Sequence, residues 1–283
     1  PDLITSAAID YDYTLDDVGN LTRIQSAIEG EQRYGYDNLD RLQSIREQNE
    51  ALIESFAYDA TGNRTSHTVG SATTSYGYTA TSHRLQQVGS QARGFDAAGN
   101  TLSGIPGYET QAARYDARNR LVEIGSGRQA PWRAQYNGRG ERVLYAEGDP
   151  APDLPERERG NDWKKEGARA TVYDEQGQVL SWLHSGRKLS FEEIIWIDST
   201  PVGRVTSSTS AVTEVHAIHT DHLNTPRALV NAQTQGNQPA GTVVWRWRLV
   251  NQGTSGSNAF GAMAAQEDPD GNGTTLRFDL RFP

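Results

Sequence analysis

A short phrase returns along the chain at a nearly constant interval. It starts with an aromatic residue, usually Tyr, and continues with Asp, a polar gap that often ends in Gly-Asn, and a pair such as Arg-Leu. A fixed period of this kind indicates a repeat array rather than one globular catalytic domain. The clearest copies begin at Tyr13, Tyr36, Tyr58, Tyr78, Phe95 and Tyr115, with weaker ones at Tyr136 and Tyr173.

The spacing and the local chemistry of the copies predict β-hairpins. From Tyr13 to Tyr136 the copies start 23, 22, 20, 17, 20 and 21 residues apart. Such a length holds two strands of roughly five or six residues and two turns. The Asp59 side chain can accept hydrogen bonds from turn amides, and Gly62 can supply the positive φ of a type I turn with a bulge. A lone hairpin is marginal in water, so we predict that the hairpins join edge to edge in a growing sheet.

Composition narrows the classes of partner and chemistry. The net charge of the 283 residues is −9 with no sustained basic run, which argues against nucleic acid as a partner. No Cys is present, so disulfides and thiolate chemistry are excluded. No stretch approaches the roughly eighteen apolar residues of a membrane span. Apart from Lys164, Lys165 and Lys188 the basic residues are all Arg. Two interpretations stay open: Arg and Tyr ladders across strands, or the codon usage of a GC-rich genome.

Three regions are expected along the chain. Residues 1–146 form the repeat array, 147–169 a charged loop insertion, and 170–283 a region of degenerate repeats that ends in further motifs. Leu276–Phe282 alternates strictly with period two and is expected to be a strand. Because the sequence opens in mid-repeat and closes on this pattern, we expect a piece of a longer polypeptide.

These residues resemble the RHS/YD-repeat family. The Tyr-Asp phrases provide one half of the resemblance. The other half is His219–Arg227, which resembles the start of the family's C-terminal core region, and Trp245-Arg-Trp, Glu267–Gly273 and Leu280–Pro283 resemble the later motifs of that region in the same order. The positions that match the family motif are Asp221, His222, Leu223, Pro226 and Arg227.

The resemblance implies an all-β fold in which YD-repeat hairpins form a spiralling sheet, part of a hollow shell or cocoon. In relatives, such as polymorphic toxins and the encapsulating parts of Tc toxin complexes, the shell encloses a C-terminal toxin domain of the same polypeptide. It implies delivery from a bacterium by type VI secretion or a similar route, with a secretion-system spike or adaptor as a further partner. Self-cleavage and toxin activity are expected downstream of Pro283. The alternative is a carbohydrate-binding or cell-surface module, since aromatic faces stack on sugars.

One His-rich stretch raises the question of a metal site. His216, His219 and His222 lie close to Asp221 in the sequence. Zinc needs about three or four converging ligands, whereas alternation along a strand sends His222 to the face opposite His219 and Asp221. We therefore prefer a structural interpretation, in which these side chains bond buried backbone groups before Pro226.

A second stretch has the spacing of half a calcium loop. Asp268, Asp270 and Asn272 precede Gly273, and Asp279 falls where a bidentate Glu is usual. No helix is expected to follow, and a proline lies inside the stretch, so an Asx turn is the preferred interpretation.

No enzyme site is predicted. Glu192 and Glu193 alternate faces of an expected strand, so they do not converge on one substrate. Ser185 and Ser190 lack a nucleophile elbow. We expect no catalytic residue, no metal and no cofactor within this chain.

Overall fold

The computed structural model describes residues 10–27, 30–125, 132–147, 168–184, 190–208, 211–248 and 264–273, with Leu276, Phe278 and Leu280. The regular elements among these residues are all β-strands, which confirms the predicted all-β hairpin array. No helix among them has the length and apolar character to cross a membrane. The expected insertion at 147–169 lies outside the described residues except at its ends, and so do Ser185 and Asp279.

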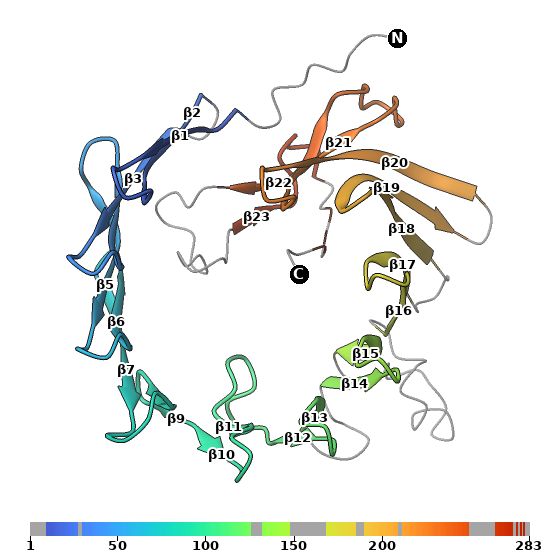
Figure 1. The fold of residues 1–283 in the computed structure, drawn as a ribbon. Helices are drawn as coiled ribbons and strands as arrows, with labels where there is room; N and C mark the ends of the chain where they lie inside the picture. Colours follow the sequence, from blue (N-terminus) through green and yellow to red (C-terminus); the bar gives the residue numbers. More distant parts are fainter. Residues whose placement is uncertain are drawn as a thin grey trace. The chain divides into compact units, whose positions relative to one another are not determined.

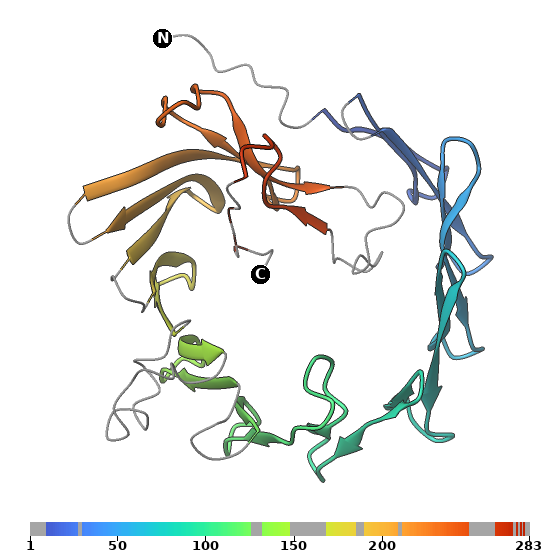
Figure 2. The same cartoon turned by 180° about the vertical axis from the view of Figure 1, so that it is seen from behind.

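The first sheet has nine strands that pair in chain order (Figures 1 and 2). The neighbouring strands from the first to the eighth are paired antiparallel. Its strands are β1 (Asp12–Leu15), β2 (Leu21–Ser26), β3 (Gly30–Tyr36), β4 (Leu42–Glu47), β5 (Leu52–Tyr58), β6 (Arg64–Val69), β7 (Ala72–Tyr78), β8 (Leu85–Val88) and β9 (Gln91–Ala92).

A two-stranded sheet and a twelve-stranded sheet come next, again in chain order. The short sheet pairs β10 (Gly94–Phe95) with β11 (Thr101–Ser103). The long sheet contains β12 (Ala113–Tyr115), β13 (Leu121–Ile124), β14 (Trp132–Tyr136), β15 (Arg142–Glu147), β16 (Arg169–Tyr173), β17 (Val179–His184), β18 (Ser190–Ile197), β19 (Thr200–Ser208), β20 (Ala211–Thr220), β21 (Pro226–Asn231), β22 (Val243–Arg248) and β23 (Ala264–Gln266).

The chain divides into two compact units. The first unit combines Pro1–Gly89 with Ala217–Pro283, and the second unit is Ser90–His216. The repeat chemistry occurs in both units, because turns of the same type begin at Asp59 in the first and at Asp116 in the second.

A β-bulge immediately precedes most of the repeated turns. In β5 the register shifts between Ala57 and Tyr58, so that Tyr58 pairs with Arg64 across the turn. The extra residue bends the strand and increases its local twist. The same shift brings the aromatic residue opposite the residue that follows the turn at Tyr36↔Leu42, Tyr78↔Leu85, Tyr115↔Leu121, Tyr136↔Arg142 and Tyr173↔Val179.

Two apolar clusters are formed by the described residues of the first unit. One is formed by Ile45, Ile53 and Phe56, against which Tyr34, Leu42 and Tyr58 pack. The other gathers around Ala228 and Val230, which are fully buried. On the paired strand β22, Trp245 lies opposite Leu229 and is also fully buried, and its ring meets those of Trp247 and Phe278 edge to face.

The expected strand over Leu276–Phe282 is not present in the described residues. Leu276, Phe278 and Leu280 lie outside any strand, and the Leu276 amide donates to the Glu267 carbonyl at 2.7 Å. Two apolar residues of this pattern, Phe278 and Leu280, are buried although neither lies in a strand.

Candidate functional site

The repeated Asp organises each turn through its carboxylate. Asp59 Oδ1 accepts hydrogen bonds from the amides of Thr61 and Asn63, both at 2.9 Å, and Oδ2 accepts one from Asn63 Nδ2 at 2.8 Å. The Asn63 side chain is the main reason that the pKa of Asp59 falls to about 2. Gly62 has a φ of 91°, a conformation that glycine adopts without strain. The predicted turn chemistry is confirmed.

The same turn recurs with substitutions that preserve its geometry. The φ > 0 position is occupied by a non-glycine residue in three copies, Asp40, Asn119 and Asn224, with φ of 57°, 59° and 61°. Asn and Asp tolerate this region better than other side chains. The turns in which the first side chain accepts amide hydrogen bonds begin at Asp16, Asp37, Asp59, Asp96, Asp116, Asn137, Asp174 and Asp221.

Six of the repeated tyrosines join a hairpin to the one before it. The Tyr58 hydroxyl donates to the carbonyl of Leu42, the first residue of the strand that follows the preceding turn. We call this series of contacts the hydroxyl ladder. Its members are Tyr36 to Leu21 (2.8 Å), Tyr58 to Leu42 (2.7 Å), Tyr78 to Arg64 (3.0 Å), Tyr115 to Thr101 (2.9 Å), Tyr136 to Leu121 (2.9 Å), Tyr173 to Arg142 (3.1 Å) and, through its indole nitrogen, Trp196 to Val179 (2.8 Å).

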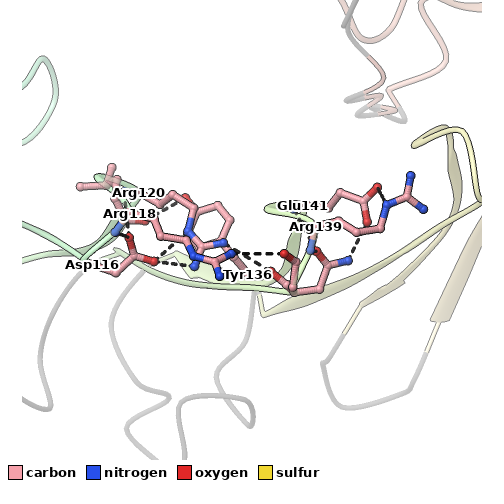
Figure 3. A network of polar contacts seen from close by, with 9 residues as sticks. Asp116, Arg118, Arg120, Tyr136, Arg139 and Glu141 are labelled. Carbon is pink, nitrogen blue, oxygen red and sulfur yellow. Dashed lines mark hydrogen bonds and ion pairs between the residues drawn. The ribbon is translucent and has the colours of Figure 1, made fainter.

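Arginine side chains add a second connection between turns. Arg120 Nε donates to Asp116 Oδ2 at 2.8 Å within its own turn, and Arg120 Nη1 donates to the Asn137 carbonyl of the next turn at 3.3 Å (Figure 3). Its guanidinium lies 4.8 Å from the centroid of the Tyr136 ring, within the range of a cation–π contact. Arg41 makes the equivalent contact with Tyr58 at 4.7 Å. Arg–Tyr ladders across the sheet are therefore present.

Arg118 and Arg139 extend this connection along the turns. Arg118 Nη1 donates to the Gly138 carbonyl at 3.2 Å, and Arg139 Nη2 donates to the Glu175 carbonyl at 2.6 Å. Figure 3 shows these side chains lying in one row from Asp116 to Glu141. The turns are thus connected by side chains as well as by the strands that lead into them.

We predict that Tyr58→Phe lowers the free energy of unfolding by about 1 kcal/mol, because the Leu42 carbonyl loses its hydroxyl donor while the ring contacts remain. Tyr76→Phe is the matched control. The Tyr76 hydroxyl makes no hydrogen bond with the described residues, and Arg64 still lies over the ring at 4.4 Å. Urea unfolding measures both variants. An equal loss in the two would mean that the hydroxyl contributes nothing.

The first copy of the phrase is aligned differently from the sequence prediction. Leu15, and not Tyr13, precedes the turn Asp and pairs with Leu21 across the turn. Tyr13 lies two residues earlier on β1, and its ring meets the imidazole of His222 at 5.5 Å. The β-bulge lies directly before the turn Asp, and the other copies have their aromatic residue at the position that Leu15 occupies here.

The family-motif positions form one more turn of the repeated type. Asp221 Oδ1 accepts the amides of Leu223 and Thr225, and Oδ2 lies 2.9 Å from Arg227 Nε and 2.7 Å from Arg227 Nη2. Burial alone would raise the pKa of Asp221, but these hydrogen bonds and the Arg227 charge hold it below its usual value. Pro226 is fully buried at the start of β21. Asp221 therefore bonds backbone groups as the structural interpretation expected.

The histidines near this turn do not share one environment. His222 is exposed, whereas burial lowers the pKa of His219. His216 is buried and contacts the Arg204 side chain, which differs from the expected bond to a backbone group. No group of three or more His, Asp or Glu in the described ranges is placed to hold a metal ion.

The acidic stretch near the C-terminus forms a turn. Both carboxylate oxygens of Asp268 accept backbone amides, from Asn272 and Gly273 at 3.0 Å each. Asp270 accepts the side-chain amides of Asn272 and Gln238. The Asp268 bonds reach amides four and five residues further on, whereas the expected Asx turn would bond the amide two residues on.

An open depression lies between two consecutive turns of the first unit. It has a volume of about 620 Å³ and is lined by Tyr76 and Tyr78, by hydroxyl side chains such as Thr65, and by His83. The depression lies where Thr79 replaces the turn Asp and the turn is one residue longer, because the Thr79 amide donates to the carbonyl of Arg84. Proteins that bind sugars contact them through aromatic rings and hydroxyl groups such as these.

Comparisons with known proteins identify the fold. No family model and no curated protein matches the chain. Solved structures match it, among them the TcdB2-TccC3-TEV complex (TM-score 0.60, 16% identity), the Photorhabdus luminescens Tc holotoxin pore (0.62, 15%) and TcdB2-TccC3 without the hypervariable C-terminal region (0.61, 16%). Each match covers 85% of this chain but 13% of the matched chain. The chain is therefore similar in fold to a small part of these Tc toxin structures.

Proposed function

We propose that this chain is a wall segment of a protein shell that encloses a toxic domain of the same polypeptide until delivery. The observation that carries the proposal is the hydroxyl ladder, in which consecutive repeats are joined by a tyrosine in addition to the strand pairing. A chain whose repeated residues connect one repeat to the next is suited to a continuous wall. The fold similarity to Tc toxin structures and the RHS/YD-repeat motifs support the same role.

The proposed mechanism is steric. A hydrogen-bonded wall keeps an enclosed domain away from substrates and proteases, and the Arg–Tyr contacts stiffen the wall between strands. In this proposal the segment acts without catalysis, the toxin and any self-cleavage belong to residues after Pro283, and delivery uses type VI secretion or a similar route. A secretion-system spike or adaptor is the further partner.

The test is protection of the enclosed domain in the whole polypeptide that carries this chain. We expect the domain after Pro283 to resist a protease that digests the same domain once it is expressed alone, and we expect electron microscopy to show a hollow particle. The triple variant Tyr36→Phe, Tyr58→Phe, Tyr136→Phe should shorten the protection time, whereas Tyr76→Phe should not. Equal digestion of the enclosed and free domains contradicts the proposal.

A second candidate function, binding of a carbohydrate, is favoured by the depression beside Tyr76 and Tyr78. A glycan array probed with the chain distinguishes the two functions. Binding that Tyr78→Ala and His83→Ala abolish would support a surface module, and an array without any bound glycan would remove this candidate.

A further inference from the structure

Four adjacent strands of the long sheet contribute to a buried polar cluster that the wall function does not require. β17 and β18 supply His184 and Glu192, β19 supplies Arg204, and β20 supplies Glu214 and His216. The three central residues are buried, since Glu192 and Arg204 are each 6% exposed and His216 is 2% exposed, whereas the outer side chains of His184 and Glu214 are 29% and 43% exposed. Burying charges is costly unless they are paired, so the arrangement of protons in this cluster is constrained.

Arg204 is the centre of the cluster. Its Nε donates to Glu192 Oε1 at 2.8 Å, and its Nη1 lies 3.4 Å from Glu214 Oε2 and 3.1 Å from His216 Nδ1. On the far side of Glu192, His184 Nε2 lies 3.4 Å from Oε2. Arg204 thus connects Glu192 of β18 to His216 and Glu214 of β20.

The chemistry of arginine fixes the protonation state of His216 in this arrangement. A guanidinium has donors only and keeps its charge in proteins, so Nδ1 of His216 must be the acceptor. An acceptor nitrogen carries no proton, and His216 is therefore neutral with its proton on Nε2. Protonation of Nδ1 would place an N–H against an N–H and a second positive charge beside the guanidinium.

We propose that the Arg204–His216 contact is an acid-released lock between β19 and β20. At neutral pH the neutral imidazole accepts from Arg204 and holds the two strands together. In acid the imidazole takes up a proton on Nδ1, the hydrogen bond is lost, and the two cations repel each other in a site with little water. The use of such a lock to free an enclosed domain rests on the proposed function, whereas the lock itself does not.

The surrounding groups decide the pH at which the lock opens. Burial, followed by the charge of Arg204, lowers the pKa of His216 to about 4, while Glu214 and Glu192 act in the opposite direction. An unfolded His titrates near 6.5, so between about 6.5 and 4 the unfolded chain binds more protons than the folded one. Stability contributed by neutral His216 is thus complete above this window and is lost as the pH falls through it.

Protonation of Glu192 also destabilises these strands in acid, at a lower pH than protonation of His216 does. Burial would raise its pKa, but hydrogen bonds from His184 and Arg204 outweigh burial and lower it. A lowered carboxylate pKa means that the stability from this group is present above its ordinary value of 4.5 and is lost as the pH falls below it. The two groups therefore weaken the same strands in the same direction, with His216 acting first.

Hydrogen exchange of the intact chain, read by mass spectrometry and corrected for the intrinsic effect of pH, tests the lock. In the native chain we expect the opening constant of β19 and β20 peptides to rise on the order of tenfold per pH unit between about pH 6 and pH 4.5. His216→Gln should lose this rise, because a glutamine side chain does not titrate in this range. His222→Gln, at an exposed position, should keep it.

Direct titration keeps the test decisive if His216→Gln does not fold. The imidazole resonance of His216 in the native chain, assigned by nuclear magnetic resonance, should report protonation well below pH 6. Protonation at or above the ordinary histidine pKa, or an unchanged acid response in a folded His216→Gln chain, overturns the lock. If exchange rises in acid while the enclosed domain stays protected from protease, the lock stands and its role in release fails.

Discussion

Trp245→Ala is expected to lower the free energy of unfolding by about 3–5 kcal/mol, the largest effect of any single substitution considered for this chain. Trp245 is fully buried on β22. Its ring centroid lies 5.4 Å from that of Trp247 and 5.1 Å from that of Phe278, with interplanar angles of 76° and 77°. Truncation removes both edge-to-face contacts and leaves a cavity that rigid strands cannot fill. Urea unfolding followed by circular dichroism measures the loss.

Trp245→Phe separates packing from the polar part of the side chain. The buried indole Nε1 has no hydrogen-bond partner among the described residues, so replacing the indole by a benzene ring removes volume without breaking a described hydrogen bond. We expect Trp245→Phe to cost less than half as much as Trp245→Ala. Leu180→Ala on β17, where the side chain is 40% exposed, is the control that should change stability little. A Trp245→Ala chain as stable as this control would contradict the assigned core.

Asp221→Ala is expected to have the second largest effect, a loss of about 3 kcal/mol. The Asp221 and Arg227 side chains are 3% and 14% exposed, so removing the carboxylate takes away the negative charge beside a poorly solvated guanidinium. The turn amides of Leu223 and Thr225 lose their acceptor as well. Thermal and urea unfolding should both register the change.

Two further variants divide this loss between the turn and the ion pair. Asp221→Asn keeps an oxygen for the amides but cannot neutralise Arg227, so its stability should fall between those of the native and Asp221→Ala chains. Asp221→Ala with Arg227→Met should recover part of the loss, because the guanidinium that faced the carboxylate is removed together with it. Strict additivity in the double variant would show that the two side chains do not interact.

The pH dependence of these effects distinguishes Asp221 from His216. The pKa of Asp221 is lowered, so the stability that Asp221 contributes is complete above the ordinary pKa of 3.8. This stability disappears only as the pH falls below that value. The contribution of His216 is already falling near pH 6. At about pH 5 the Asp221→Ala loss should therefore be nearly unchanged, while the strands held by Arg204 and His216 have begun to open.

The sequence was sufficient for the chemistry of the repeated turns, which depends on neighbouring residues. Asp59 and Gly62 lie within one turn, and their roles follow from the reach of a carboxylate and from the φ that glycine permits. Alternation likewise predicted that Glu192 and Glu193 point to opposite faces, and Glu192 is buried while Glu193 is exposed. Such contacts need no knowledge of how the hairpins pack.

Contacts between hairpins could not be predicted in the same way. The acceptor of the Tyr136 hydroxyl is 15 residues earlier, and that of Tyr173 is 31 residues earlier. Which carbonyl each hydroxyl reaches depends on the register of the whole sheet. The sequence does indicate that the hydroxyl group has a role at this position. Six of the seven aromatic residues there, from Tyr36 to Tyr173, are Tyr, and only Phe95 lacks a hydroxyl.

The polar cluster around Arg204 was missed for a similar reason. Glu192 and His216 are each 12 residues from Arg204, on separate strands, and nothing in their local sequence marks them as partners. His216 was instead considered with its sequence neighbours His219 and His222. The sheet separates these histidines and brings His216 next to a residue of β19.

The hydroxyl ladder has a direction, and this direction has a consequence for synthesis. Every described tyrosine in it donates to a carbonyl that precedes it in the chain, as Tyr58 does to Leu42 and Tyr115 to Thr101. Because the ribosome makes the chain from the N-terminus onward, each tyrosine emerges after the carbonyl group to which it donates. The sheet can be extended one repeat at a time as it is made, and the domain that it is proposed to enclose would emerge last.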